Sequence, residues 1–190
     1  MEITLHQALQ HHLDASHKGD HKLDLIGQVL KGGADINETY PPSNVDYNVT
    51  PLLWCINHRL FDAANLLVTE GANVHSAMEL GHFAPLHTLA WCFDGSEGAT
   101  QLVRNLLLRG ADPNALADGK ETPLHKAARE GKEALVKTLL LAGAHVEAKE
   151  VAGKTALWIA NENGQETTVK ILLQNGANEQ EIKRVKRERE

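Results

Sequence analysis

The stretch ETPLHKAAREGKEALVKTLLLAGAHVEA, residues 121–148, decides the fold. Thr122 followed by Pro123 predicts a sharp helix start, because a threonine side chain can accept a hydrogen bond from the first turn and proline needs no amide donor there. Two alanines then keep this helix thin, and Gly131 can adopt the positive φ that a turn into a second helix requires. Gly143 is expected to end the second, apolar helix. The stretch therefore predicts one helix–turn–helix unit.

This unit recurs along the chain. Gly-Ala pairs close an apolar segment five times, at spacings of 38, 39, 33 and 33 residues, beginning at Gly33, Gly71, Gly110, Gly143 and Gly176. Each closing pair has a matching opening upstream, at Ile3–His6, Thr50–Leu53, Ala84–His87, Thr122–His125 and Thr155–Trp158. Because one such unit cannot bury its apolar face alone, five copies in phase predict a stacked solenoid.

These residues resemble the ankyrin repeat, whose pattern runs G-x-T-P-L-H-x-A-A-x-x-G, then an apolar second helix, then L-L-x-x-G-A-D-x-N. The resemblance covers about residues 3–178, and residues 121–148 follow the pattern almost throughout. It implies an all-α repeat solenoid of helix–turn–helix repeats with β-hairpin or loop fingers, in which His87 and His125 hydrogen-bond between adjacent repeats. We expect repeats at about 1–38, 39–76, 77–115, 116–148 and 149–178, then a charged tail at 179–190.

The first three repeats depart from the regular period. The first and third carry extra residues, expected between their two helices, at HLDASHKGDHK and FDGSEGA. Insertions in solenoids are usually placed in loops, so ETYPPSNVDYN predicts an enlarged finger between the first two repeats. Polar residues at both ends predict capping repeats, with His11, His12 and Asp14 at one end and Glu179 at the other.

Composition limits the classes of partner. The chain has 19 Lys plus Arg against 25 Asp plus Glu and a formal net charge of -6, which argues against nucleic acid as the main ligand. No apolar run approaches the roughly 20 residues that cross a bilayer, and the N-terminus lacks the apolar run of a signal peptide. We therefore expect a cytoplasmic protein with reduced thiols and no membrane partner.

Catalysis and metal binding find little support in the sequence. Cys55 near His58, and Cys92 near His87, could be imagined as nucleophile pairs, but Cys55 aligns with the small Ala127 of the fourth repeat and is better explained as a packed residue. We expect no catalytic residue, no metal, no cofactor and no small-molecule substrate.

Two terminal motifs leave alternatives open. His17 and His21 could hold zinc if their segment were helical; the alternative is that they form part of a polar cap surface. Residues Lys183–Arg187 fit a short basic nuclear import signal; the alternative is a terminal helix stabilised by salt bridges.

Aromatic residues give the strongest functional signal. Seven of the eight lie between residues 40 and 93. The resemblance implies that partners bind on the concave side, at the fingertips and the exposed face of each inner helix. Carried over by alignment, these positions predict an apolar centre and a charged rim for a partner protein, formed by Tyr47, Phe83, Trp91, Asp118, Glu121, Arg129 and Glu130.

Some of these rings have an alternative explanation. Irregular repeats need larger side chains to fill gaps, so Trp54 and Phe61 are expected in the core, and Phe93 stays open because it enters an insertion.

The sequence thus predicts a non-enzymatic adaptor, inhibitor or targeting protein that binds a partner protein through the concave face of repeats two to four. One alternative is the targeting or substrate-recognition part of a larger enzyme, since the sequence stops within a charged segment. Another is a secreted bacterial effector that acts on a host protein in the host cytosol.

Overall fold

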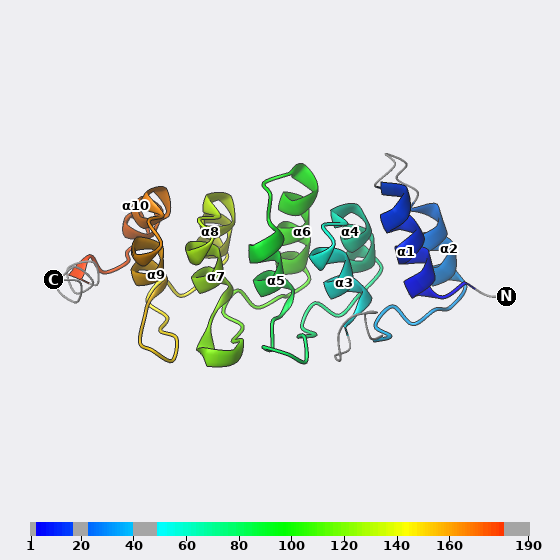
Figure 1. Cartoon of the computed structure of the whole chain (residues 1–190), viewed down its shortest axis with the longest axis horizontal. Coiled ribbons are helices and arrows are strands. Elements are labelled where there is room, and N and C mark those ends of the chain that lie inside the picture. The colour runs from blue at the N-terminus through cyan, green and yellow to red at the C-terminus, as the bar shows by residue number, and fades with distance from the viewer. Residues whose placement is uncertain (1–2, 17–22, 40–48, 181–190) are drawn as a thin grey trace.

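The computed structural model describes residues 3–16, 23–39 and 49–180. Within these ranges ten α-helices follow one another as five pairs, and Figure 1 shows the pairs side by side in a row. The helices are α1 (Leu5–Ser16), α2 (Asp24–Lys31), α3 (Pro51–Asn57), α4 (Phe61–Thr69), α5 (Pro85–Cys92), α6 (Glu97–Leu108), α7 (Pro123–Arg129), α8 (Glu133–Leu141), α9 (Ala156–Glu162) and α10 (Glu166–Gln174). This arrangement confirms the predicted all-α repeat solenoid.

Local sequence explains where the helices begin and end. The side chain of Thr122 accepts a hydrogen bond from the His125 amide, and Pro123 occupies the first turn of α7. Gly131 and Gly143 follow α7 and α8 with φ of +64° and +88°, a region that glycine enters without a steric penalty. Residues 121–148 therefore fold as their sequence predicts.

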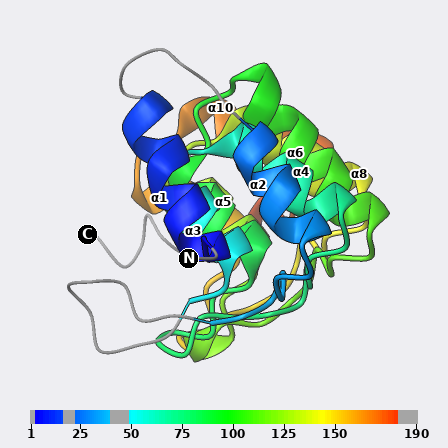
Figure 2. The ribbon, with the colours of Figure 1, turned by 90° about the vertical axis from the view of Figure 1, so that its right-hand side faces the viewer.

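The helices form two layers, which Figure 2 shows in a view along the row of repeats. The first helix of each pair contacts the first helix of the next pair, from α1 to α9, and the second helices make the same contacts from α4 to α10. The buried core between the layers is mostly Leu, Ile, Val and Ala. We call α3, α5, α7 and α9 the inner helices. Their exposed side, together with the fingers that connect the repeats, is the inner face, the side predicted to be concave.

The fingers between repeats are loops rather than strand ladders over the described residues. We number each finger by the repeat whose inner helix follows it, so that finger three precedes α5, finger four precedes α7 and finger five precedes α9. Finger four contains a short 3₁₀ turn at Asp118–Lys120. Backbone hydrogen bonds close the three fingers that precede α5, α7 and α9, from Met78 N–H to Phe83 O (3.1 Å), Ala117 N–H to Glu121 O (2.9 Å) and Glu150 N–H to Lys154 O (3.2 Å). Two further bonds join neighbouring fingers, from Asp118 N–H to Gly81 O (3.0 Å) and Val151 N–H to Gly119 O (2.8 Å). The fingers are thus tied together along one edge of the solenoid.

The insertions lie partly in helices, which corrects their expected position between helices. In the first repeat HLDAS continues α1 to Ser16, and in the third repeat α6 begins at Glu97, inside FDGSEGA. His12 is buried, although it was expected on a polar cap surface. The segment with His17 and His21, most of the enlarged finger and the basic tail lie outside the described residues.

Candidate functional site

Two aromatic side chains meet on the inner face of repeat three. Phe83 stands two residues before α5, and Trp91 lies in the last turn of that helix. Their ring centroids are 4.8 Å apart at 66°, an edge-to-face arrangement that aromatic pairs favour. Phe83 is half-buried, whereas Trp91 keeps 40% of its surface exposed. The pair therefore offers an apolar surface to solvent.

A lysine of the next repeat covers part of this pair. The Lys126 ammonium lies 4.7 Å from the ring centroids of both Phe83 and Trp91, within the range of cation–π attraction. The same ammonium is 2.6 Å from Glu121 Oε2, and Arg129 Nη2 pairs with the other carboxylate oxygen. Repeats three and four are thus connected by a chain of contacts from two rings through Lys126 to Glu121 and Arg129.

The charges of this cluster stabilise one another. Burial alone would raise the pKa of the Glu121 carboxyl, but hydrogen bonds and positive charge from Arg129 and Lys126 outweigh it and hold that pKa below its ordinary value. Glu121 therefore stays ionised near neutral pH. Because the Glu121 side chain is only 15% exposed, its carboxylate interacts mainly with Lys126 and Arg129 within the chain.

The predicted site residues separate into three groups. The structure brings Phe83, Trp91, Glu121 and Arg129 together, while Tyr47 lies outside the described residues. The Glu121 side chain is only 15% exposed, so it offers little surface to the predicted charged rim.

The two remaining charged positions are exposed. Asp118 lies in finger four with an oxygen 2.7 Å from His82 Nδ1 of finger three, so it helps to join the fingers. Glu130 caps the end of α7 and is exposed there.

Lys126 is the site residue that sequence reasoning missed. The sequence signal for this residue was a lysine within the largely apolar segment TPLHKAA. In the structure its side chain is only 9% exposed. Such a lysine needs a partner nearby, since long cationic side chains are rarely buried unless paired. Its partners come from two different repeats, which the sequence alone does not place at its side.

The signature histidines connect adjacent repeats, as predicted. His87 Nε2 lies 3.0 Å from Glu121 O, and His125 Nε2 lies 3.0 Å from Ala148 O and 3.2 Å from Lys154 O. Burial lowers the pKa of both imidazoles. Both histidines therefore act as neutral structural groups.

The second nitrogens of these histidines differ. His125 Nδ1 is 2.8 Å from the Thr122 hydroxyl, but Ala84 stands at the corresponding position of repeat three. His125 Nδ1 also accepts from the Thr122 amide at 3.1 Å, a bond that the Ala84 amide does not make in repeat three, so His87 Nδ1 is buried with no hydrogen-bond partner.

Neither cysteine has the features of a nucleophile. Cys55 is fully buried, and burial raises the pKa of its thiol far above the ordinary range. Burial also raises the pKa of Cys92, despite nearby positive charge from Arg59 and Lys132. Across residues 3–16, 23–39 and 49–180 no three His, Cys, Asp or Glu side chains cluster as a metal site would require.

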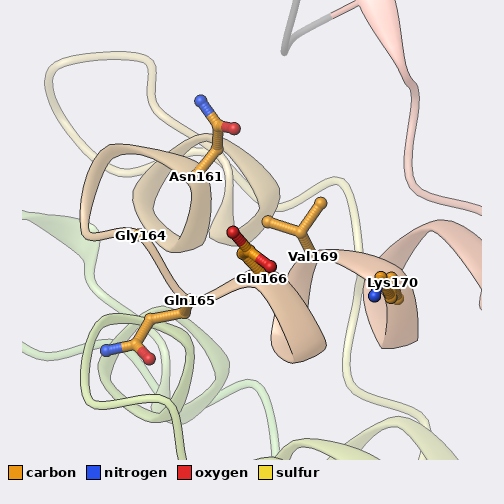
Figure 3. Close-up of a pocket in the computed structure, with 6 residues that line it drawn as sticks. All are labelled: Asn161, Gly164, Gln165, Glu166, Val169 and Lys170. Carbon is orange, nitrogen blue, oxygen red and sulfur yellow. The ribbon is translucent and has the colours of Figure 1, made fainter.

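The other surface features of the described chain are modest. A hollow of about 230 Å³ on the last repeat is drawn in Figure 3 and is lined by Asn161, Gly164, Gln165, Glu166, Val169 and Lys170. It is smaller than the roughly 300 Å³ at which small-molecule sites usually begin. The Gln165 amide also reaches repeat four, where it donates to Arg129 O at 3.1 Å. Within the described ranges no helix has the length and apolar character needed to span a membrane.

A comparison with known protein families identifies a repeat pattern that agrees with the observed helix pairs. The sequence pattern of the ankyrin repeats, in three copies, matches residues 86–183, which is more than half of the chain. The chain belongs to the ankyrin repeat family. Ankyrin repeats are protein–protein interaction modules and are generally non-catalytic.

Three relatives carry similar repeats. The Arabidopsis thaliana protein named as E3 ubiquitin-protein ligase XBAT35 is 40% identical over 80 residues, 41% of this chain and 16% of that protein. The E3 ubiquitin-protein ligase KEG, also of Arabidopsis thaliana, is 34% identical over 105 residues, 51% of this chain and 6% of KEG. The fowlpox virus protein named as ankyrin repeat protein FPV216 is 32% identical over 106 residues, 56% of this chain and 34% of that protein. The matches therefore span about a third of each relative's length or less.

Proposed function

We propose that this ankyrin array binds a partner protein through the inner face of repeats two to four, as an adaptor, inhibitor or targeting protein. One observation carries the proposal: among the described aromatic side chains, Trp91 alone is exposed. Trp54, Phe61, Phe93 and Trp158 are all buried, so the core accounts for them.

An exposed tryptophan on a rigid support is typical of interface anchors. Tryptophan buries a large area and loses little conformational entropy on binding, which is why it is enriched at the centres of interfaces. Here the Phe83 ring and the Lys126 ammonium both lie close to the Trp91 ring. The cluster of Phe83, Trp91 and Lys126 is the proposed centre, and Asp118, Arg129 and Glu130 lie on finger four and the next inner helix.

Affinity purification with mass spectrometry tests this proposal. The wild-type chain is compared with the double variant Phe83→Ser/Trp91→Ser in lysate of the source cell. We call α4, α6, α8 and α10 the outer helices. The matched control is a double variant at exposed leucines that end two of them, Leu108→Ser/Leu141→Ser. We expect at least one protein to be enriched by wild type and by the control but lost with the inner-face variant. Equal enrichment by all three chains would place binding elsewhere.

A second candidate function is substrate recognition within a larger ubiquitin ligase. It is favoured by two relatives named as E3 ubiquitin-protein ligases, of which the matching repeats form a small part. Under this candidate, an antibody against the repeats detects a much longer polypeptide in the source cell, and the captured partner carries ubiquitin. A native polypeptide of 20.8 kDa would count against it.

A further inference from the structure

In repeats three and four, the signature histidine is covered by the finger that follows the repeat. His125 lies within hydrogen-bond distance of Ala148 O and Lys154 O, which stand five and eleven residues after the closing Gly143. In repeat three, the carbonyl that His87 contacts also stands eleven residues after the closing glycine. The chain that follows each closing glycine therefore encloses this position of the repeat.

Repeat five has a tryptophan in place of the signature histidine. Trp158 is only 9% exposed, although α9 is the inner helix of the last pair in the described chain. It lies outside the main buried core of the solenoid. The Lys154 ammonium, 3.5 Å from the ring centroid, covers part of the indole. By the pattern of repeats three and four, the residues after Gly176 are expected to supply further cover.

The chain after Gly176 starts along the path of a finger. Asn178 N–H donates to Glu147 Oε1 at 2.8 Å, as His145 N–H donates to Asn114 Oδ1 at 2.7 Å one repeat earlier. Both amides belong to the second residue after the closing glycine of their repeat. The register of the earlier finger is therefore kept as the chain enters its C-terminal tail.

The same count of five to eleven residues past the closing glycine reaches residues 181–187, which lie outside the described residues. Within this segment the two apolar residues are Ile182 and Val185. Because the Lys154 ammonium already lies on the indole, apolar side chains suit the remaining ring surface better than the basic ones between them. We propose that residues 181–187 dock on repeat five as a closing cap, with their two apolar side chains on Trp158.

This cap is independent of the proposed function, because it concerns the end of the solenoid and not the inner face of repeats two to four. It also gives a setting to the basic stretch Lys183–Arg187. The central residue of that stretch, Val185, is held against repeat five in the docked tail. An import receptor that binds the basic stretch would therefore compete with the cap.

Fluorine NMR of the full chain labelled with fluorotryptophan tests the inference. The chain has three tryptophans, and the variant Trp158→Phe assigns the Trp158 resonance. We expect the double variant Ile182→Ser/Val185→Ser to move that resonance and to raise its solvent isotope shift toward that of the exposed Trp91. Both substitutions lie in the tail, so the packing within repeat five is left unchanged.

The matched control is Arg184→Ser/Arg187→Ser, which changes two tail residues with the same spacing. It should leave the Trp158 resonance where it is in wild type. The buried Trp54, in repeat two, serves as an internal reference and should not move in either double variant.

Four results would overturn the inference. The Trp158 resonance could stay unchanged in the apolar double variant, or it could move equally in the control, which would assign the contact to charge. A Trp158 signal that depends on protein concentration would assign the cover to a second copy of the chain. A solvent isotope shift at Trp158 of wild type as large as that at Trp91 would show a surface left open for another protein.

Discussion

The substitution Ala84→Thr is expected to stabilise the protein. Ala84 is the N-cap residue of α5 and makes no side-chain hydrogen bond there, while three residues later the buried His87 Nδ1 has no partner. In repeat four Thr122 both caps the helix and contacts the histidine. Its hydroxyl accepts a hydrogen bond from the His125 amide and lies 2.8 Å from His125 Nδ1. The backbone already suits threonine, because φ and ψ are −69° and 163° at Ala84 and −98° and 164° at Thr122.

The expected gain follows from these two contacts. A threonine N-cap is typically worth about 1 kcal/mol over alanine, and a partner for a buried polar atom adds roughly another 1 kcal/mol. Ordering the new side chain offsets part of this, so the free energy of unfolding should rise by about 1–2 kcal/mol. For a chain of this size, each kcal/mol raises the melting temperature by about 2–4 °C.

Urea denaturation followed by circular dichroism measures the effect as a shift in midpoint. The control is Ala84→Val, which adds similar bulk without a hydroxyl and should not stabilise. The converse variant Thr122→Ala should lose a comparable amount in repeat four. If Ala84→Thr were no more stable than Ala84→Val, the account of His87 as an unsatisfied group would be refuted.

Three further predictions concern binding, pH and the turn in repeat four. Trp91→Ala should weaken partner binding by more than about 1 kcal/mol, measured by calorimetric titration with the captured partner. Urea unfolding of the variant should stay as cooperative as that of wild type. An unchanged affinity would show that Trp91 is not an interface anchor. Because burial lowers the pKa of His87 and His125, the unfolded state binds more protons once the pH falls below about 6.5, so stability should be full above that pH and decline as it falls toward the folded-state values. Urea midpoints at neutral and mildly acidic pH check this, and an equal or higher acidic midpoint would contradict it. Gly131→Ala should lower the midpoint by the equivalent of about 1 kcal/mol or more, because φ is +64° and the added Cβ would displace the Gln165 amide, which donates to Arg129 O. An unchanged midpoint would argue against that turn geometry.

The sequence predicts the helix pairs because the signals that start and end them are local. Thr122, Pro123 and Gly143 each act within a turn of their own position, so their roles can be derived without coordinates. The length of α1 was harder to predict, since HLDAS resembles a loop insertion but continues α1 to Ser16.

The candidate site was only partly predictable for a different reason. Alignment places Phe83 and Trp91 on the inner face, but the position of Lys126 over both rings depends on how repeats three and four stack. The same stacking leaves little of Glu121 exposed, which its assignment to a charged rim did not anticipate. Contacts between repeats therefore mark the limit of what the repeat pattern could predict.

The central claim is that a partner protein covers the inner face around Trp91. Hydrogen–deuterium exchange of the chain, alone and in complex with the captured partner, tests it most directly. We predict that the partner slows exchange in finger three, the end of α5 and the start of α7, and leaves the outer helices α6 and α8 unchanged. Protection confined to the outer helices, with α5 and finger three unaffected, would contradict the claim.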